Sequence, residues 1–278
     1  MPPEARAADL SAPLGPRSRP LQHLRRLSGR RRARADAGQF VVDGPTLLGE
    51  AFDAGLDVVE VYAEPSAASW ALDRARGHDV PVRPVEEGAL AKVTSPVTPQ
   101  SVAALAAIPP GAGSAALAGL VLVAAGVGDP GNFGTLVRVS EAAGASAVVS
   151  CADAVDPWNP KCVRAAAGSL FRIPVLAAGP LVDVVARLHE AGMNVLACDL
   201  HADTAYDDAD LAGAVAVVLG NEAHGLAPDD LAVVDGAVFI PMAGRVESIN
   251  VAMAGTVLAF ESARQRRRPT AGRDEPSS

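Results

Sequence analysis

The stretch LVLVAAGVGDPGNFGTLVRVSEAAGA, residues 120–145, decides the fold class of this chain. It opens with five apolar residues, which is typical of a strand buried on both faces of a sheet. A turn containing Gly126, Gly128 and Gly131 follows, and the next residues have the amphipathic pattern of a helix over 135–143. A strand, a glycine-rich turn and a helix in this order predict an α/β domain with a parallel sheet.

The same alternation continues through the second half of the chain. Apolar runs predict strands at residues 120–124, 147–150, 173–176, 195–198, 215–219 and 237–240. Helical patterns lie between them, notably at residues 160–169 and 181–191, and a last helix is predicted from Ser248 to about Arg267. We therefore expect one domain with a parallel sheet over residues 120–268.

The first half predicts a smaller α/β domain over residues 20–108. An arginine-rich helix leads into a strand at 40–42, after which helices at 45–54 and 67–76 alternate with strands at 58–62, 80–82 and within 97–108. The segment PPGAGSAALAG, residues 109–119, is the predicted linker. Residues 1–19 are rich in Pro, Ala and Arg, and we expect them and residues 269–278 to be disordered.

Composition excludes several classes of protein. A length of 278 residues suits two modest domains, and an apolar share of 49% is enough for a core in each. No apolar run is long enough to cross a bilayer, and the N-terminus lacks the apolar region of a secretory signal. Cys151, Cys162 and Cys198 are odd in number and lack metal-ligand spacing, so we expect reduced thiols, no metal site and a cytoplasmic protein.

The net charge of -8 is unevenly distributed along the sequence. Residues 115–261 contain 17 acidic and 6 basic side chains, whereas arginines gather near the N-terminus. Such a cluster is an electrostatic footprint for phosphate, although a solvated basic arm would have the same composition. The candidate residues for binding nucleic-acid phosphates are Arg25, Arg26, Arg30, Arg31, Arg32 and Arg34.

The glycine-rich turn has the G-x-G-x-x-G pattern of a dinucleotide-binding loop. Its glycines would let the backbone approach a pyrophosphate, and Asp153 lies loosely at the offset expected for a ribose ligand. However, Pro130 removes a backbone donor, and Asn132 begins a turn-prone triplet that is expected to delay the helix. Arg138 inside the first helix also has no role in hydride transfer.

Two further loops carry polar residues directly after predicted strands. The first is VVLGNEAHGL, residues 217–226, and the second is FIPMAGRVESINVAM, residues 239–253, in which Ser248 is a candidate helix N-cap. Ligands of open α/β sheets bind beyond the carboxyl ends of the strands, so these loops and the glycine-rich turn should converge. The side chains expected to meet there are Asn132, Arg138, Glu222, Ser248 and Asn250. This set suits a neutral or cationic cofactor held by backbone groups, with one arginine for an anion.

At these three stretches the sequence resembles the SpoU/TrmH-like RNA 2'-O-methyltransferases of the SPOUT superfamily. DPGNFGTLVRVSEAAGA (129–145) is similar to the first motif of the family, VVLGNEAHGL (217–226) to the second and IPMAGRVESINVAMA (240–254) to the third. RRARADAGQFVVDGPTLLGEAF (31–52) and PVTPQSVAAL (96–105) resemble the L30e/L7Ae-like substrate-binding domain that precedes the catalytic domain. In that domain Asp43 replaces a usual glutamate and Ser101 replaces a usual glycine.

The resemblance implies a deep trefoil knot in the C-terminal domain, with S-adenosylmethionine held in the knot by the second and third motifs. Backbone groups at Gly220, Ile240 and Ile249 would contact the cofactor. It also implies a homodimer formed through the knotted domain, in which an arginine at the position of Arg138 completes the active site of the other subunit. The full set of implied cofactor-binding residues is Leu219, Gly220, Asn221, Gly225, Ile240, Met242 and Ile249.

The implied reaction is an in-line attack of a ribose 2'-hydroxyl on the cofactor's methyl group. A guanidinium stays protonated, so we expect Arg138 to stabilise the forming alkoxide or to grip the adjacent phosphate. The other four candidate residues would orient the substrate and the loops. The auxiliary domain favours 23S ribosomal RNA as substrate; the open alternatives are a transfer-RNA methyltransferase, an NAD(P)-dependent oxidoreductase and a non-catalytic RNA-binding module.

Overall fold

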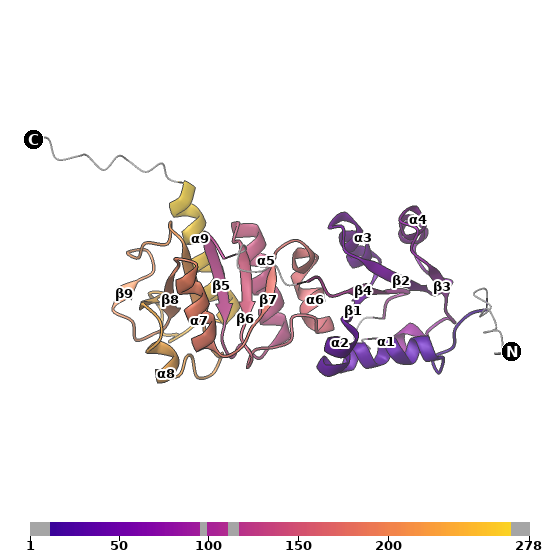
Figure 1. Cartoon of the computed structure of the whole chain (residues 1–278), viewed down its shortest axis with the longest axis horizontal. Helices are drawn as coiled ribbons and strands as arrows, with labels where there is room; N and C mark the ends of the chain where they lie inside the picture. The colour runs from indigo at the N-terminus through magenta and orange to yellow at the C-terminus, as the bar shows by residue number, and fades with distance from the viewer. Residues whose placement is uncertain (1–11, 95–98, 111–116, 268–278) are drawn as a thin grey trace, which may run out of the picture. The chain divides into compact units, whose positions relative to one another are not determined.

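The computed structural model of the chain describes residues 12–94, 99–110 and 117–267 (Figure 1). Residues 1–11 of the predicted arm, 111–116 of the predicted linker and 269–278 of the predicted tail lie outside the described residues. Among the helices described, none is both long and apolar enough to cross a membrane. The chain forms two units: unit 1 comprises Met1–Pro109 and Trp158–Arg164, and unit 2 comprises Pro110–Pro157 and Ala165–Ser278.

Unit 1 contains a four-stranded sheet in the order β1-β4-β2-β3. The strands β1 and β2 both pair antiparallel with β4, and β3 pairs parallel with β2. The strands are β1 (Gln39–Asp43), β2 (Val58–Ala63), β3 (Val82–Pro84) and β4 (Val102–Ala107), and the helices are α1 (Arg19–Gly29), α2 (Arg31–Ala37), α3 (Pro45–Asp53) and α4 (Ser69–Gly77), with a short 3-10 helix at Leu90–Lys92. The α/β alternation predicted for residues 20–108 is therefore present.

The arginine-rich helix α1 is held in place by its apolar face. Leu21, Leu24 and Leu27 recur at helical spacing, are fully buried, and pack with residues of the sheet such as Val41. Residues 12–18, predicted to be disordered, instead contact the sheet, because Leu14 forms a bridge with Val85 and packs on the same core. The packing of Leu14 and its backbone hydrogen bonds with Pro84 and Glu86 anchor this proline-rich segment.

Unit 2 contains a parallel seven-stranded sheet in the order β7-β6-β5-β10-β8-β11-β9 (Figure 1). The strands are β5 (Leu120–Ala124), β6 (Ala147–Ser150), β7 (Val175–Ala177), β8 (Asn194–Cys198), β9 (Thr204–Ala205), β10 (Val215–Leu219) and β11 (Gly236–Phe239). The helices are α5 (Pro130–Ala143), α7 (Leu181–Glu190), α8 (Pro228–Leu231) and α9 (Val251–Arg267), with a 3-10 helix at Ser169–Phe171. The helix α6 (Pro160–Ala166) begins in the segment Trp158–Arg164, which belongs to unit 1. The predicted parallel sheet is confirmed; β9 and α8 were not predicted.

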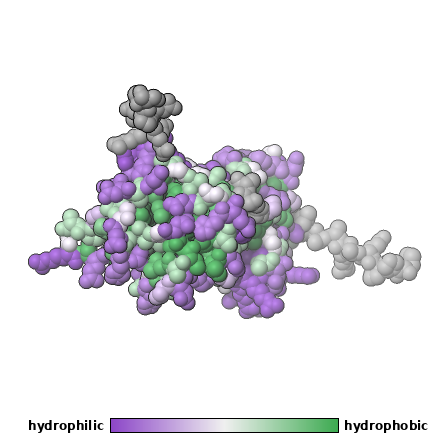
Figure 2. All heavy atoms as spheres, turned by 60° about the vertical axis from the view of Figure 1, so that its left-hand side comes forward, coloured by the Kyte–Doolittle hydropathy of each residue, from purple (hydrophilic) through white to green (hydrophobic). Residues whose placement is uncertain are grey.

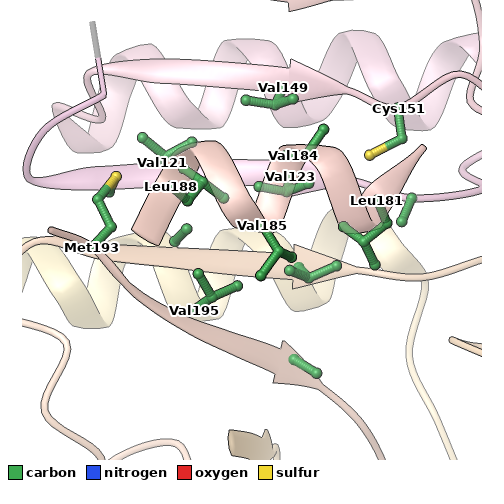
Figure 3. Packing of buried hydrophobic residues seen from close by; sticks show 14 of the residues in the cluster. Val121, Val123, Val149, Cys151, Leu181, Val184, Val185, Leu188, Met193 and Val195 are labelled. Carbon is green, nitrogen blue, oxygen red and sulfur yellow. The ribbon is translucent and has the colours of Figure 1, made fainter. Parts of the chain in front are cut away.

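The core of unit 2 lies on both faces of this sheet. All five residues of β5 and all five of β10 are buried, as the continuous apolar runs predict. On one face, α7 places Leu181, Val184 and Leu188 over the sheet, where they pack with Val121 and other valines (Figure 3). On the opposite side of β5 and β10, α5 packs against α9.

Two helix starts differ from the prediction. The helix α5 begins at Pro130 rather than at residue 135, because proline suits the first helical turn and the Asp129 carboxylate accepts a hydrogen bond from the Asn132 N–H (2.9 Å). The last helix begins at Val251, and Asn250 rather than Ser248 accepts the N–H of Ala252 (2.8 Å). Asn250 directly precedes the helix and Ser248 lies two residues before Asn250, so the prediction of Ser248 as the N-cap is wrong.

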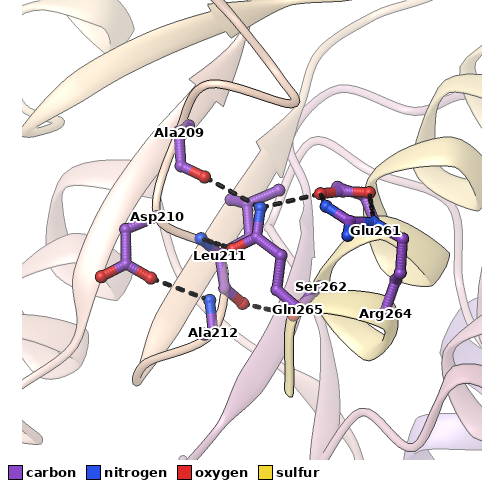
Figure 4. A network of polar contacts seen from close by, with 8 residues as sticks. All are labelled: Ala209, Asp210, Leu211, Ala212, Glu261, Ser262, Arg264 and Gln265. Atoms are coloured by element: carbon purple, nitrogen blue, oxygen red, sulfur yellow. Dashed lines mark hydrogen bonds and ion pairs between the residues drawn. The ribbon is translucent and has the colours of Figure 1, made fainter. Parts of the chain in front are cut away.

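The C-terminal half of α9 is tied to the segment that precedes β10 (Figure 4). Gln265 accepts the N–H of Leu211 (2.8 Å) and donates to the carbonyl of Ala209 (3.0 Å). The hydroxyl of Ser262 donates to the carbonyl of Leu211 (2.6 Å). These bonds satisfy backbone groups of a segment that is not part of a strand.

Candidate functional site

A cavity of about 820 Å³ lies in unit 2 beyond the carboxyl ends of three neighbouring strands. The loops that follow β8, β10 and β11 line it, together with the first turn of α9. This is where ligands bind in open α/β sheets, and the volume is in the range of small-molecule sites. Its lining includes every residue predicted to bind a cofactor: Leu219, Gly220, Asn221, Gly225, Ile240, Met242 and Ile249.

The loop after β10 is a tight turn that requires glycine at its first position. Asn221 and Gly225 exchange two backbone hydrogen bonds of 2.9 Å, which folds the loop back on itself. A Cβ atom on Gly220 would lie 2.5 Å from the carbonyl carbon of Gly225, closer than any side chain can tolerate. The Asn221 side chain stabilises the loop with two hydrogen bonds. It accepts the N–H of Ala223 within the loop (2.9 Å) and donates to the carbonyl of Gly126 in the glycine-rich turn (2.9 Å).

Glu222 joins this loop to the start of α5. Its carboxylate accepts the backbone N–H groups of Gly128 and Asp129, both at 3.2 Å, and the side-chain amide of Asn132 at 3.0 Å. Asn132 in turn accepts the side-chain amide of Asn250 at 2.9 Å. The three predicted motifs are therefore connected by one chain of hydrogen bonds, Glu222 to Asn132 to Asn250.

The three donors determine the charge state of Glu222. Partial burial raises the pKa of this carboxyl, but the hydrogen bonds from Asn132, Gly128 and Asp129 more than offset that effect. Its pKa is therefore below the ordinary value, and the group stays ionised near neutral pH. A carboxylate that is occupied by three donors acts as a fixed acceptor that positions Asn132, so we do not assign Glu222 as a general base.

The hydrogen bonds to Glu222 argue against a dinucleotide at the glycine-rich turn. In a dinucleotide-binding loop, the backbone N–H groups before the helix hold a pyrophosphate. Here two of these groups, from Gly128 and Asp129, already hold the Glu222 carboxylate. The cavity lies at the other loops, and the turn supplies none of its lining residues.

The remaining catalytic candidates are divided between two places. Ser248 and Asn250 line the cavity with Glu222, and Asn132 is hydrogen-bonded to Glu222 and Asn250. Arg138 does not line the cavity; it is exposed on α5, about 9 Å along the helix axis from Asn132. The guanidinium expected to act on the substrate is thus outside the cavity of its own chain.

The loop after β8 also lines the cavity and was not predicted. It contributes Asp199, Leu200 and His201, next to Cys198 at the end of β8. Burial raises the pKa of the Cys198 thiol to about 11, and the Asp199 carboxylate adds to this shift, so the thiol stays protonated and is a poor nucleophile. No glycine or motif marks this loop in the sequence; the only available signal is that it follows an apolar strand.

The structure also shows where the cysteines and the arginines predicted to bind phosphate lie. No disulfide bond joins Cys151, Cys162 and Cys198 to one another. In the described parts of the chain, no cluster of three or more His, Cys, Asp or Glu residues could hold a metal ion. Arg34 is only 3% exposed and donates to the carbonyl of Leu27, so its prediction as a phosphate ligand is wrong. The other five arginines are exposed on unit 1.

Comparisons with known proteins agree with this geometry. The sequence model of the SpoU rRNA Methylase family matches residues 119–260, and that of the MRM3-like substrate binding domain matches residues 20–104. An uncharacterized tRNA/rRNA methyltransferase of Synechocystis sp. is 30% identical over 93% of this chain and 94% of its own length. The 23S rRNA (guanosine(2553)-2'-O)-methyltransferase RlmP of Bacillus subtilis is 31% identical over 83% of this chain and 90% of its own.

A solved structure is similar over most of the chain. It is the SpoU methyltransferase AviRb of Streptomyces viridochromogenes in complex with the cofactor AdoMet. Its TM-score with this chain is 0.82 at 28% sequence identity, and the match covers 90% of this chain and 98% of that one.

Proposed function

Because this chain belongs to the SpoU rRNA methylase family, we propose that it transfers a methyl group from S-adenosylmethionine to a ribose 2'-hydroxyl of 23S ribosomal RNA. The observation that carries this proposal is the cavity at the carboxyl ends of β8, β10 and β11, joined by hydrogen bonds to Asn132. The relative RlmP is named for this reaction, and AviRb was solved with the cofactor.

The lining of the cavity suits this cofactor. Leu219, Ile240 and Met242 offer apolar surface for an adenine ring, and the backbone of the Gly220 turn offers polar groups. Asp199 places a carboxylate at the cavity, which favours a ligand with cationic groups. When bound, S-adenosylmethionine would supply an electrophilic methyl group on a sulfonium that is already a good leaving group.

The chain's own residues would hold the ribose and handle its charge. Asn132, fixed between Glu222 and Asn250, is placed to orient the substrate at the cavity rim. Arg138 would stabilise the negative charge that develops on the 2'-oxygen or grip the adjacent phosphate, because a guanidinium does not act as a base near neutral pH. Holding oxygen and methyl in line would supply much of the acceleration.

We further propose a homodimer formed through the second domain, in which each Arg138 serves the cavity of the other subunit. Arg138 lies outside the cavity of its own chain. On α9, Met253 and Phe260 are 61% and 43% exposed and lie two turns apart on one face of the helix. Hydrophobic residues are visible among hydrophilic ones on the face drawn in Figure 2, and exposed apolar surface is typical of interaction sites.

The domain assignment and the knot complete the proposal. Residues 20–108 would bind RNA as the substrate-binding domain and residues 120–268 would carry the catalytic cavity, with 109–119 as linker. As the family resemblance implies, the last helix would be threaded through a loop to form a deep trefoil knot, and the cofactor would bind in that knot. With ribosomal RNA as its substrate, the enzyme would act in the cytoplasm.

The experiment that tests the function is single-turnover transfer of a radiolabelled methyl group to 23S ribosomal RNA from cells that lack this gene. We expect incorporation at one ribose 2'-oxygen, located by resistance of the adjacent linkage to alkaline cleavage. Calorimetry with S-adenosylmethionine and with NAD distinguishes a methyltransferase from an NAD(P)-dependent oxidoreductase, because each would bind only its own cofactor. Methyl transfer to transfer RNA alone, or binding of NAD alone, would overturn the proposal.

The variant Arg138→Ala tests the assigned role within this reaction. We expect at least a hundredfold lower rate of methyl transfer, because the charge that stabilises the transition state is removed, with an unchanged affinity for S-adenosylmethionine. A normal rate in this variant would show that the arginine takes no part in the reaction.

A further inference from the structure

Unit 1 contains a second cavity, of about 470 Å³, that is lined by four cationic side chains. They are Arg25 on α1, Lys92 at the end of the short 3-10 helix, and Lys161 and Arg164 on α6. All residues that line this cavity belong to unit 1, because the segment Trp158–Arg164 groups with that unit. Three stretches that are far apart in the sequence therefore bring positive charge to one place.

The concentration of charge goes against the composition of the chain. The whole sequence carries a net charge of -8, yet the lining of this cavity includes no Asp or Glu. Lys92 and Lys161 are the only two lysines in 278 residues, and both line it. Random placement of two lysines in an acidic protein would rarely put them in one cavity.

Three of the four cations are available to a ligand. The side chains of Arg25, Lys92 and Lys161 are exposed, and the residues described in the structure provide no carboxylate partner for them. Arg164 is different, because its guanidinium lies 3.4 Å from the carboxylate of Asp43. That contact holds Arg164 in position. Because Asp43 does not line the cavity, the lining itself stays positively charged.

Neutral donors complete the lining. Ser28 lines the cavity, and its hydroxyl oxygen is buried and has no hydrogen-bond partner among the described residues. Asn159 also lines it; its side-chain oxygen accepts the N–H of Lys161 (2.9 Å), so the oxygen is turned toward the backbone. Lysine and arginine with hydroxyl and amide donors are the side chains that contact nucleic-acid phosphates.

We propose that this cavity binds the phosphodiester backbone of the substrate RNA. The choice of RNA as the source of the phosphate rests on the function proposed above. The site extends the phosphate-binding surface beyond the arginines of α1 and α2 to two lysines that the arginine cluster does not include. Lysine contacts to phosphate carry no sequence information, so the site would set affinity and position rather than choose the nucleotide.

The test compares the double variant Lys92→Gln/Lys161→Gln with the control Arg76→Gln/Arg187→Gln. The control removes two exposed charges that lie outside this cavity, so the net charge of both variants is the same. Binding of a fluorescein-labelled fragment of 23S ribosomal RNA is measured over a range of salt concentrations. We expect the slope of log affinity against log salt to fall in magnitude by about 1.5 in the lysine variant and to stay unchanged in the control.

The possible outcomes separate this proposal from the proposed function. If wild-type protein binds and methylates the RNA while the lysine variant keeps the wild-type slope, this site is wrong and the function stands. If wild-type protein transfers no methyl group to ribosomal RNA but the lysine variant has lost RNA binding, the function is wrong and the phosphate site stands. Calorimetry with inorganic phosphate at constant ionic strength gives the last outcome: tight binding that the lysine variant loses would assign the cavity to a free phosphate and overturn the RNA proposal.

Discussion

The substitution Asp43→Asn should make unit 1 more stable at neutral pH. The Asp43 carboxyl ends β1, is 3% exposed, and lies 3.4 Å from the Arg164 guanidinium. Its Oδ1 atom is buried and has no hydrogen-bond partner among the described residues. Burial raises the pKa of this carboxyl from 3.8 to about 6, even though the Arg164 charge lowers it.

The sign of the effect follows from where each state releases the proton. The unfolded chain loses the proton of Asp43 near pH 3.8, whereas the folded chain keeps it until about pH 6. The contribution of Asp43 to the unfolding free energy is therefore fully present below pH 3.8 and is lost as the pH rises to about 6. A shift of about 2 pK units corresponds to roughly 3 kcal/mol of unfolding free energy.

The assay uses the position of the two tryptophans. Trp70 lies on α4 and Trp158 packs against Phe40 of β1 with ring centroids 4.7 Å apart, so both report on unit 1. Urea unfolding followed by tryptophan fluorescence should give a gap between Asp43→Asn and wild type that is small near pH 4 and reaches roughly 3 kcal/mol near pH 8. Asp36→Asn, at an exposed aspartate of the same unit, is the control and should show no such gap.

The pH dependence of the gap decides the outcome. A fixed cost of placing an amide beside Arg164 would shift the free energy equally at every pH and leave the dependence intact. A gap that is constant from pH 4 to 8 would refute the reasoning, as would a wild-type protein that gains stability over this range relative to the variant.

Three other substitutions test the site and the fold of unit 2. Gly220→Ala should lower the affinity for S-adenosylmethionine at least tenfold in calorimetry, because the added Cβ would lie 2.5 Å from the Gly225 carbonyl carbon; wild-type affinity would contradict the predicted turn. In Glu222→Gln an NH₂ group replaces one of the two acceptor oxygens and must face a donor, because Gly128 donates to Oε2 while Asp129 and Asn132 donate to Oε1. The single-turnover rate should therefore fall by about 10- to 100-fold, and an unchanged rate would remove Glu222 from the positioning of Asn132. Gln265→Leu leaves the backbone groups of the segment before β10 unpaired and should lower the unfolding free energy by about 1–3 kcal/mol in urea titrations followed by circular dichroism; an unchanged unfolding free energy would contradict this.

The parts of the fold that could be predicted are those with a physical cause in the local sequence. The strands β5 and β10 are continuous apolar runs because both of their faces are covered, and their bounds were predicted correctly. The two-residue strand β9 has no such pattern, because a strand this short buries too little to require one. Strand order also has no local signature, since it depends on which crossovers the whole sheet accommodates.

The candidate site shows the same division. The loops after β10 and β11 could be found because they contain glycines and polar residues that local turns require. The loop after β8 could not be found in this way. It lines the cavity only because β8 pairs with β10, and that pairing has no pattern in the local sequence. Arg34 looked like its neighbours in an arginine cluster, and only the packing of α1 and α2 shows that it is buried.

The segment Trp158–Arg164 limits how freely the two halves of this protein can be exchanged during evolution or by engineering. A fragment that ends at Pro109 would lack the indole that packs on Phe40 and the guanidinium that faces Asp43. The buried carboxylate of Asp43 would then lose its only described counter-charge. A substrate-binding domain transplanted onto another catalytic domain would thus need these seven residues of the recipient to be replaced as well, so the heritable module is discontinuous in the gene.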